Sequence, residues 1–388
     1  MAALPSRPAP RGARVPHRLF ENKVHECPRS SSDAGKTVPP EQVWERGIVI
    51  GDWTVRVTHG RIANASDIEA LSEKLDVPLP EMPFLHNALT LEHARSGFSY
   101  CFDAVRALRC IDGVRPEQQL TPIECEPAAQ AVGPHARPHR TLSRSGIQVA
   151  YAKEWGQSRR AALAAQGGSS ASLTSTKQYD WTYSSTWPGM PGATAPDDVH
   201  DPRSPIRRTA WHDAFQLGTD PARDRIPVER LSAASGEPIL FYDDIVLYED
   251  ELGDNGSSLL HVKVRVMPTS LLVLQRFFLR VDQVVFRLFD TRLFVPFDEP
   301  TPRAIRECRG MQVPYIDVQQ CLPPHRANDL SLLTQVGWVA EAMERACARR
   351  ARAPQAPSSE RWEGEGACVH VALLRPREPT AGEASCSS

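Results

Sequence analysis

Residues 237–294 read EPILFYDDIVLYEDELGDNGSSLLHVKVRVMPTSLLVLQRFFLRVDQVVFRLFDTRLF and combine dense strand patterning with two turn signals. Asn255-Gly256 is a favoured type I′ hairpin dipeptide, because both central positions of that turn need φ > 0. A two-residue loop there would set Asp250 opposite His261. The next strand would then alternate, with Leu260, Val262, Val264 and Val266 toward the core and His261, Lys263 and Arg265 away from it.

A second hairpin is expected from residues 271–281 and 284–289, with its turn at Asp282-Gln283. At ~1.5–3 kcal/mol per buried large apolar side chain, its apolar face contributes on the order of 10 kcal/mol before entropy is subtracted. A lone hairpin remains marginal, so these strands need a second layer. The prediction is an α+β fold of mainly antiparallel sheets, packed sandwich-like, with flanking short helices. The expected apolar face consists of Phe277, Leu279, Val281, Val284, Phe286 and Leu288.

Earlier residues supply candidates for the second layer. Residues 48–57 alternate like one strand, and Ser66 with Glu69 has the form of a capping box that starts a helix. Further strands are expected around Leu89 and Leu91 and at residues 98–102, followed by a short helix or turn at 103–110.

Proline marks the irregular parts of the chain. The 34 prolines in 388 residues are roughly twice the usual share of about 5%. We therefore expect a disordered extension at 1–42, a single domain at 43–350 and a disordered tail at 351–388. Residues 113–145 and 160–177 contain few large apolar side chains and are predicted to be disordered insertions.

Charge and cysteine usage narrow the function classes. A net charge of −2 and a pI near 6.6 argue against a nucleic-acid-binding protein. The longest apolar stretch, residues 271–279, is interrupted by Gln275 and Arg276 and is too short for a membrane span. Nine cysteines without a C-x-x-C pair, in a chain without an evident secretory leader, predict reduced thiols in the cytoplasm or nucleus.

An acidic run is the most tempting catalytic candidate: Glu249, Asp250, Glu251 and Asp254. It misses the spacing of a calcium loop, because Leu252 stands where an oxygen ligand belongs. The histidines are scattered and lack the paired spacing of zinc ligands, so we expect no metal and no cofactor. Cross-strand pairing with basic residues explains the run better than catalysis. The alternative enzyme reading is a carboxylate-dependent hydrolase that uses Glu249, Asp250 and His261.

Two further features favour binding. Trp181, Tyr183 and Trp187 form an aromatic cluster, in which we expect Trp181 in the core and Trp187 more exposed. An open apolar pocket beside them would indicate a small-ligand-binding β module. Asp290-Thr291-Arg292 is expected at the end of the second hairpin, where a charged loop tip suits recognition of a partner. An internal Asp–Arg salt bridge is the alternative there.

A series of motifs in fixed order spans residues 43–294. They are GDW at 51–53, LPEM at 79–82, ALRC at 107–110, EW at 154–155, YDWTY at 179–183, LYEDEL at 247–252, RVMP at 265–268, RFFLR at 276–280 and DTRL at 290–293. In these motifs the chain resembles the TIPRL-type regulators of TOR signalling, the Tap-interacting proteins that bind catalytic subunits of type 2A protein phosphatases.

The resemblance implies a non-catalytic, mostly cytosolic protein whose cleft docks a phosphatase catalytic subunit, with a Tap-type regulatory subunit as a further partner. Contact positions carried over by it are Ile226, Leu288 and Asp290. Arg292 and Trp181 complete the predicted partner-binding set. The chain departs from the family at Arg106, where relatives often carry an acidic residue, a reversal that would weaken binding to a basic patch.

Overall fold

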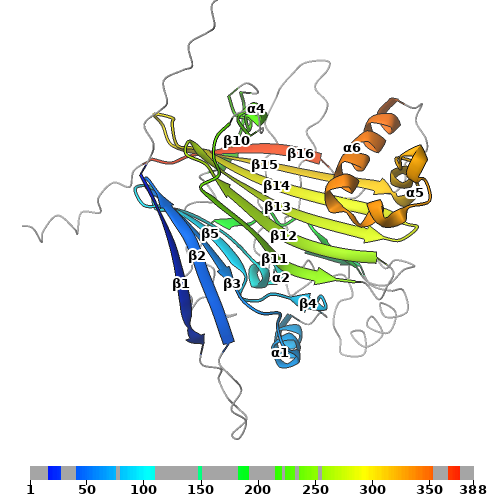
Figure 1. Ribbon diagram of the computed structural model, residues 1–388, viewed down its shortest axis with the longest axis horizontal. Helices are drawn as coiled ribbons and strands as arrows, with labels where there is room; N and C mark the ends of the chain where they lie inside the picture. Colours follow the sequence, from blue (N-terminus) through cyan, green and yellow to red (C-terminus); the bar gives the residue numbers. More distant parts are fainter. Residues whose placement is uncertain are drawn as a thin grey trace, which may run out of the picture.

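The computed structural model describes residues 16–27, 41–75, 79–109, 147–150, 182–191, 215–220, 223–231, 236–251, 256–352 and 366–375. Two antiparallel sheets dominate it (Figure 1). The predicted α+β fold of antiparallel sheets with short flanking helices is confirmed. Among the described residues, no helix is both long enough and apolar enough to cross a bilayer.

The first sheet has six strands in the order β1-β2-β3-β5-β6-β9. A helix, α1 (Ala65–Leu75), lies between β3 and β4, and a short helix, α2 (Ala104–Arg109), follows β6. The strands are β1 (His17–Cys27), β2 (Glu41–Ile50), β3 (Trp53–His59), β5 (Ala88–His93), β6 (Phe98–Asp103) and β9 (Met190–Pro191).

The second sheet has eight strands in the order β10-β16-β15-β14-β13-β12-β11-β4. Its centre is a meander in which β11 to β15 pair with their sequence neighbours. The strands are β4 (Met82–Pro83), β10 (Phe215–Leu217), β11 (Phe241–Asp250), β12 (Gly256–Val266), β13 (Ser270–Val281), β14 (Val285–Pro296), β15 (Arg303–Pro314) and β16 (Gly366–Leu373). A small third sheet pairs β7 (Ile147–Ala150) with β8 (Thr182–Ser185).

The main core lies between the two sheets. Ile48, Val55 and Leu91 from the first sheet belong to one buried cluster with Leu260 and Phe277 from the second. The predicted alternation of β12 is confirmed, because Leu260, Val262, Val264 and Val266 all belong to this cluster. We call this side of the eight-stranded sheet its inner face.

The outer face of the eight-stranded sheet is covered near both of its ends. One end packs under α5 (Tyr315–Gln319), α6 (Val336–Arg352) and the 3-10 turn η7 (Leu330–Thr334), in a second apolar cluster; another turn, η6 (Pro324–Arg326), precedes η7. The other end packs under α4 (Val228–Leu231) in a third cluster. The helical coverings stand apart over the sheet, α4 above its upper left end and α5 with α6 at its right (Figure 1).

Both hairpin loops differ from the prediction. In the first hairpin Asp250 pairs with Ser258, and a bulge between Val246 and Tyr248 brings Val246 opposite His261. The predicted pairing of Asp250 with His261 is therefore wrong, and Gly256 belongs to β12 itself. Asp250 is already out of the predicted register, so the difference begins at the connection between β11 and β12, which is longer than two residues; the bulge farther along β11 then adds one more residue.

In the second hairpin Val281 pairs with Val285, so the loop holds three residues and not the predicted two. Gln283 takes a positive φ of 59°, as a three-residue loop with a left-handed position requires. The added residue reverses the faces of β14. Phe286 and Leu288 therefore pack outward against Phe278 in the cluster under α6, and not on the predicted face with Phe277.

Three local predictions in the first half are corrected. Residues 48–57 form parts of two strands, because the chain turns at Gly51, whose φ is 57°. Asn64 caps α1 in place of Ser66, since its Oδ1 accepts from the backbone N of Asp67 at 2.9 Å. The strands β5 and β6 and the helix α2 appear as predicted.

Two segments expected to be disordered contribute strands. Within 1–42, β1 pairs along most of its length with β2, and within 351–388, β16 pairs with both β15 and β10. Both strands depend on pairing with another segment, the next strand for β1 and distant strands for β16, which local composition does not report. The predicted insertions at 113–145 and 160–177 lie outside the described residues.

Candidate functional site

The uncovered part of the outer face carries two rows of polar side chains. His261, Arg276, Asp290 and Arg309 lie opposite one another on β12 to β15. Lys263, Arg292 and Glu307 lie in the neighbouring row, which Asp244 of β11 extends and in which Leu274 occupies the β13 position. We call these residues the polar strip: Asp244, His261, Lys263, Arg276, Asp290, Arg292, Glu307 and Arg309.

An ion pair forms the floor of the polar strip. Arg276 donates from Nε to Asp290 Oδ1 and from Nη2 to Asp290 Oδ2, both at 2.7 Å. The side chain of Asp290 is only 6% exposed and that of Arg276 14%. Burial alone would lower the pKa of Arg276, but the hydrogen bonds and charge of Asp290 outweigh it and raise the pKa. The guanidinium of Arg276 therefore stays charged, and two hydrogen bonds fix the pair in a bidentate geometry.

Cations at the surface of the polar strip are more accessible. Arg292 places Nη2 3.6 Å from Asp290 Oδ2 while 40% of its side chain stays exposed. Lys263 pairs with Asp244 at 2.8 Å and is similarly exposed. Burial lowers the pKa of His261 below its ordinary value, so its ring is neutral at pH 7. The exposed arginine and lysine are the groups that can engage an incoming anion.

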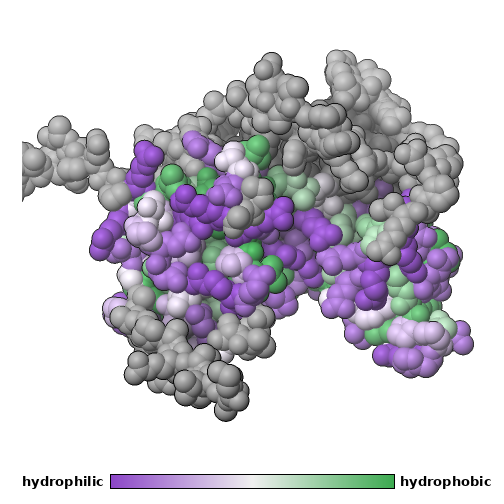
Figure 2. All heavy atoms as spheres, turned by 90° about the horizontal axis from the view of Figure 1, so that it is seen from above, coloured by the Kyte–Doolittle hydropathy of each residue, from purple (hydrophilic) through white to green (hydrophobic). Residues whose placement is uncertain are grey.

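Two apolar walls flank the polar strip. On one side Ile226 packs with Phe294 and Ile305, and its backbone N donates to Glu307 Oε1 at 2.9 Å. On the other side Leu288 packs beneath α6, and Arg309 donates to Glu344 Oε1 of α6 at 2.7 Å. Figure 2 shows the α5–α6 end projecting, with a hollow between it and the rest of the described surface. The polar strip thus lies on the sheet between two structured walls, and we call the strip together with these walls the trough.

Four of the five predicted partner-binding residues converge here. Asp290 and Arg292 lie in the polar strip, while Ile226 and Leu288 are buried in its two walls, 6% and 1% exposed. Trp181 lies outside the described residues. The predicted loop tip at 290–292 is wrong, because these residues lie in the middle of β14. The internal salt bridge considered as the alternative is present, with Arg276 as the partner of Asp290.

The sequence prediction missed several members of the polar strip. Arg276, Glu307 and Arg309 were not predicted as site residues, although charged residues recur at every second position on neighbouring strands. Because successive side chains of a strand point to opposite faces, charged residues at every second position lie on the same face of the sheet. Bringing the strands into line requires the register, which the hairpin prediction had wrong by one residue.

Residues of the predicted hydrolase site do not converge. Asp250 lies on the inner face opposite Ser258 and accepts from the backbone N of Glu81 at 3.2 Å, whereas His261 lies on the outer face. His261 instead approaches Asp244, at 3.7 Å. No group of histidine, cysteine, aspartate or glutamate side chains in the described parts of the chain has an arrangement that could hold a metal ion.

The aromatic prediction also changes. Trp187 is 1% exposed and packs edge-on against Phe102, so the expectation of a more exposed Trp187 is wrong. Its backbone O accepts a hydrogen bond from Gln275 Nε2 of β13. Trp187 therefore anchors the segment before β9 in the core. At Arg106, the departure from the family pattern is a buried side chain paired with Asp103 at 3.3 Å.

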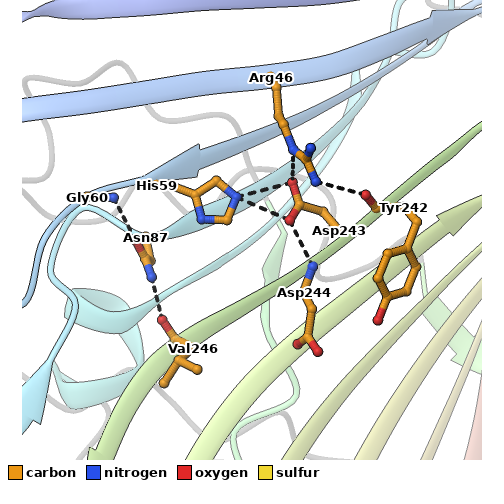
Figure 3. Close-up of polar contacts among 8 residues, drawn as sticks. All are labelled: Arg46, His59, Gly60, Asn87, Tyr242, Asp243, Asp244 and Val246. Carbon is orange, nitrogen blue, oxygen red and sulfur yellow. Dashed lines mark hydrogen bonds and ion pairs between the residues drawn. The ribbon is translucent and has the colours of Figure 1, made fainter.

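A second polar cluster lies on the inner side, where β11 meets the first sheet (Figure 3). Asp243 accepts from Arg46 Nε at 2.6 Å and from His59 Nε2 at 3.2 Å, and the backbone N of Asp244 donates to it at 2.8 Å. Burial alone would raise the pKa of Asp243, but the bonds from His59 and Arg46 outweigh it and lower the pKa. Asp243 is thus a charged anchor between the sheets.

Asn87 makes a parallel connection beside it (Figure 3). Its Oδ1 accepts from the backbone N of Gly60 at 2.7 Å, and its Nδ2 donates to the backbone O of Val246 at 2.6 Å. These bonds join the end of β3 to β11 through one side chain. We assign the whole cluster to holding the two sheets together, because its polar groups already satisfy one another.

Comparison with known proteins agrees with the motif resemblance. A sequence model of the TIP41-like family matches residues 82–319. The chain is 33% identical over 307 residues to the "Type 2A phosphatase activator TIP41" of Saccharomyces cerevisiae, covering 76% of this chain and 70% of that protein. It is 32% identical over 255 residues to the "TIP41-like protein" of Homo sapiens, covering 66% and 72%. It is 34% identical over 264 residues to the Arabidopsis thaliana "TIP41-like protein", covering 68% and 76%.

Proposed function

The chain belongs to the TIP41-like family, and from this premise we propose that it regulates type 2A serine/threonine protein phosphatases by binding their catalytic subunit. The yeast relatives from Saccharomyces cerevisiae and Schizosaccharomyces pombe are both named type 2A phosphatase activators. In this proposal the chain contributes a surface and does not catalyse a reaction. The phosphatase supplies the chemistry.

The polar strip is the proposed binding surface. The observation that carries this assignment is the meeting of Ile226, Leu288, Asp290 and Arg292 on one face of one sheet. Ile226 and Leu288 are buried, so their role is to fix the two walls. Asp290 and Arg292 lie between the walls, and Arg292 Nη2 is 3.6 Å from Asp290 Oδ2.

The electrostatics of the polar strip suit a charged partner segment. Asp290 is held rigidly by Arg276, so the floor needs no reorganisation when a partner arrives. Arg292 and Lys263 remain exposed enough to bind carboxylates of the partner. Such surface charges act mainly on the association rate and on its salt dependence, which distinguishes them from buried contacts.

The wider setting of the proposal is TOR-linked signalling with a Tap-type regulatory subunit as a further partner, and it rests on the family resemblance alone. The proposed location in the cytoplasm or nucleus is also supported by the cysteine usage of the chain. Trp181 stays in the proposed contact set because of the aromatic cluster that it forms in the sequence with Tyr183 and Trp187.

The test uses a charge reversal at an exposed position. Arg292→Glu should weaken binding of a purified type 2A catalytic subunit by about tenfold or more, with most of the loss in the association rate. Arg56→Glu is the matched control, because Arg56 is 42% exposed and also lies on a strand, but in the other sheet. Biolayer interferometry with the full chain at two salt concentrations measures both rates.

Two results would remove the proposal. If the full chain fails to bind any type 2A catalytic subunit, the function is wrong. If Arg292→Glu binds as tightly as the unaltered chain, or Arg56→Glu loses as much, the surface is misplaced. Asp290→Lys is a poorer probe, because it would bury a second cation beside Arg276 and disturb the sheet itself.

A further inference from the structure

Two cysteines face each other between the sheets, away from the polar strip. Cys308 on β15 and Cys368 on β16 are directly opposed partners in the antiparallel ladder. Neither cysteine is in a disulfide. Opposed residues on neighbouring antiparallel strands have Cα atoms about 4.5–5.5 Å apart, which lies within the range of about 4.4–6.8 Å found in disulfides. A bond between them needs little movement of the backbone.

A buried arginine sits beside this pair. Arg306, 3% exposed, precedes Cys308 by two residues and so lies on the same face of β15. Its Nη1 donates to the Tyr100 hydroxyl at 3.1 Å, and its guanidinium lies 4.5 Å from the centroid of the Phe215 ring. Among the described residues no carboxylate forms an ion pair with Arg306. A buried cation in this setting favours a negative charge nearby.

A comparison of Cys308 with Cys101 shows how Cys368 and Arg306 affect the pKa of a buried thiol. Both thiols are buried, and burial raises the pKa of Cys101 to about 12. The pKa of Cys308 is instead lowered, by a hydrogen bond from Cys368 and by the charge of Arg306. Thr291 adds a contact at 3.8 Å between its Oγ1 and Cys308 Sγ. The thiolate of Cys308 is therefore stabilised in the core while Cys101 stays a thiol.

Cys368 offers the access that Cys308 lacks. It is partly exposed, whereas Cys308 is 4% exposed. The neighbouring edge strand β10 pairs only as far as His370, and the backbone N of Gly218 then bonds the O of Val369. In the described part of the chain, the ladder between β10 and β16 therefore does not extend to Cys368.

From this arrangement we propose that Cys308 and Cys368 form a reversible cross-strand disulfide when the protein meets hydrogen peroxide. Cys368 Sγ attacks one peroxide oxygen, the O–O bond breaks, and the thiol proton leaves with the hydroxide as water, which gives a sulfenic acid. The Cys308 thiolate then attacks Cys368 Sγ and expels hydroxide, which takes up the proton that Cys308 had released and gives the second water. In total two thiols and one peroxide give one disulfide and two waters, and the peroxide is the oxidant.

The bond would lock β16 to β15 and close a loop that contains α5, η7 and α6. Cross-linking a long loop restricts the unfolded chain, so the oxidised protein should be more stable. The outer side of β16 contributes Val369 and Val371 to the apolar cluster that holds Ile226. Oxidation would therefore make one wall of the trough more resistant to opening.

The test treats the full chain with hydrogen peroxide, alkylates the remaining thiols and maps the peptides by mass spectrometry. The expected result is a linked peptide pair containing Cys308 and Cys368, which dithiothreitol separates. The Tm should rise by about 5 °C on oxidation and return on reduction. Cys368→Ser should abolish the linked pair and the Tm shift, while Cys347→Ser, which removes another partly exposed thiol, should leave both unchanged.

Recovery of Cys308 and Cys368 as separate sulfinic acids would overturn the proposal. So would their recovery as free thiols at a peroxide concentration that oxidises Cys347. If Cys368→Ser fails to fold, the peptide map of the unaltered chain still decides between these outcomes. None of them depends on whether the chain binds a phosphatase.

Discussion

The ion pair of Arg276 and Asp290 shows how strongly single side chains can affect the stability of this molecule. Both charges lie largely out of water, where each would be costly alone. Their bidentate contact compensates that cost and keeps both groups in one place. Removing one partner should therefore lower the free energy of unfolding much more than removing both, because only the single removal leaves an unpaired buried charge.

We expect Asp290→Ala to lower the free energy of unfolding by about 3–5 kcal/mol, because Arg276 is left as an unpaired buried charge. The double variant Arg276→Met/Asp290→Leu should lose much less, since it removes both charges and refills the space. Urea denaturation with a fitted m-value measures each. Arg309→Ala is the surface control: its pair with Glu344 is about half exposed and should be worth under about 1 kcal/mol. Equal losses in the single and double variants would contradict this account.

The buried histidine of β16 predicts a pH dependence. Burial, followed by the charge of Arg306, lowers the pKa of His370 from its ordinary value near 6.5 to about 4. The unfolded chain therefore binds a proton at a higher pH than the folded chain does. Stability is fully present above pH 6.5 and is lost as the pH falls toward 4, by about 2–3 kcal/mol from this group.

The check is the free energy of unfolding between pH 4 and pH 7 for the unaltered chain and for His370→Gln. The variant should be less stable at pH 7 and should show a shallower decline toward pH 4. His261, whose pKa burial also lowers, keeps titrating in both proteins. An unchanged slope in the variant would mean that His370 does not carry the effect.

The N-terminal cap of α1 shows what could not be predicted from the sequence for a single residue. Ser66 with Glu69 matches the capping-box pattern, but Asn64 makes the cap, and its Oδ1 also accepts from Ser66 Oγ at 2.6 Å. Asparagine and serine are equally good caps, so the residues alone could not separate two starts this close together. The helix itself was predictable from its apolar spacing.

At the scale of elements, the loop from β13 to β14 decides which side chains form the site. Strand identity followed from alternation and was predictable. The face that β14 shows to the core depended on one residue of loop length. With the predicted two-residue loop Leu288 would have joined the inter-sheet core; the observed loop puts Leu288 and Asp290 on the outer face.

Deleting Val284 should therefore destroy the fold, because a two-residue loop would move Phe286 and Leu288 to the wrong face. Gln283→Gly should do the opposite and stabilise the chain by about 1 kcal/mol, since Gln283 has a positive φ that glycine adopts without strain. Circular dichroism and thermal melts compare the two. A deletion variant that melts cooperatively near the unaltered Tm would show that the loop does not set the register.

At the scale of the whole molecule, the sequence was sufficient to predict two packed antiparallel sheets. It was not sufficient to predict the strands β1 and β16, which come from the two ends of the described chain. Alternation in residues 237–294 required a second layer, and that layer exists. The strands β1 and β16 lie in polar surroundings of the sequence and form by pairing with β2 and β15. Of the polar strip, Asp290 was predicted from the family resemblance and Arg292 from the charged segment 290–292, while the alignment of the charged residues in rows became visible only from the observed strand pairing.

Removing β16 should therefore affect the whole domain. A chain ending at residue 365 loses β16, leaves the edge of β15 open and exposes Arg306 and Cys308. A chain ending at residue 375 keeps every described strand and is the matched control. We expect the shorter chain to be insoluble or to melt at least about 10 °C lower, and the longer one to melt like the unaltered chain. Equal thermal melts would contradict the structural role of β16.

The position of β10 in the sheet has a consequence for protein synthesis. Its sole strand partner among the described residues is β16, which leaves the ribosome some 150 residues later. While β11 to β15 emerge and pair with one another in turn, the backbone N–H and C=O groups of residues 215–217 have no strand to pair with. Nascent chains of this protein would therefore be prone to aggregate until translation is nearly complete. We expect them to bind chaperones that shield open sheet edges.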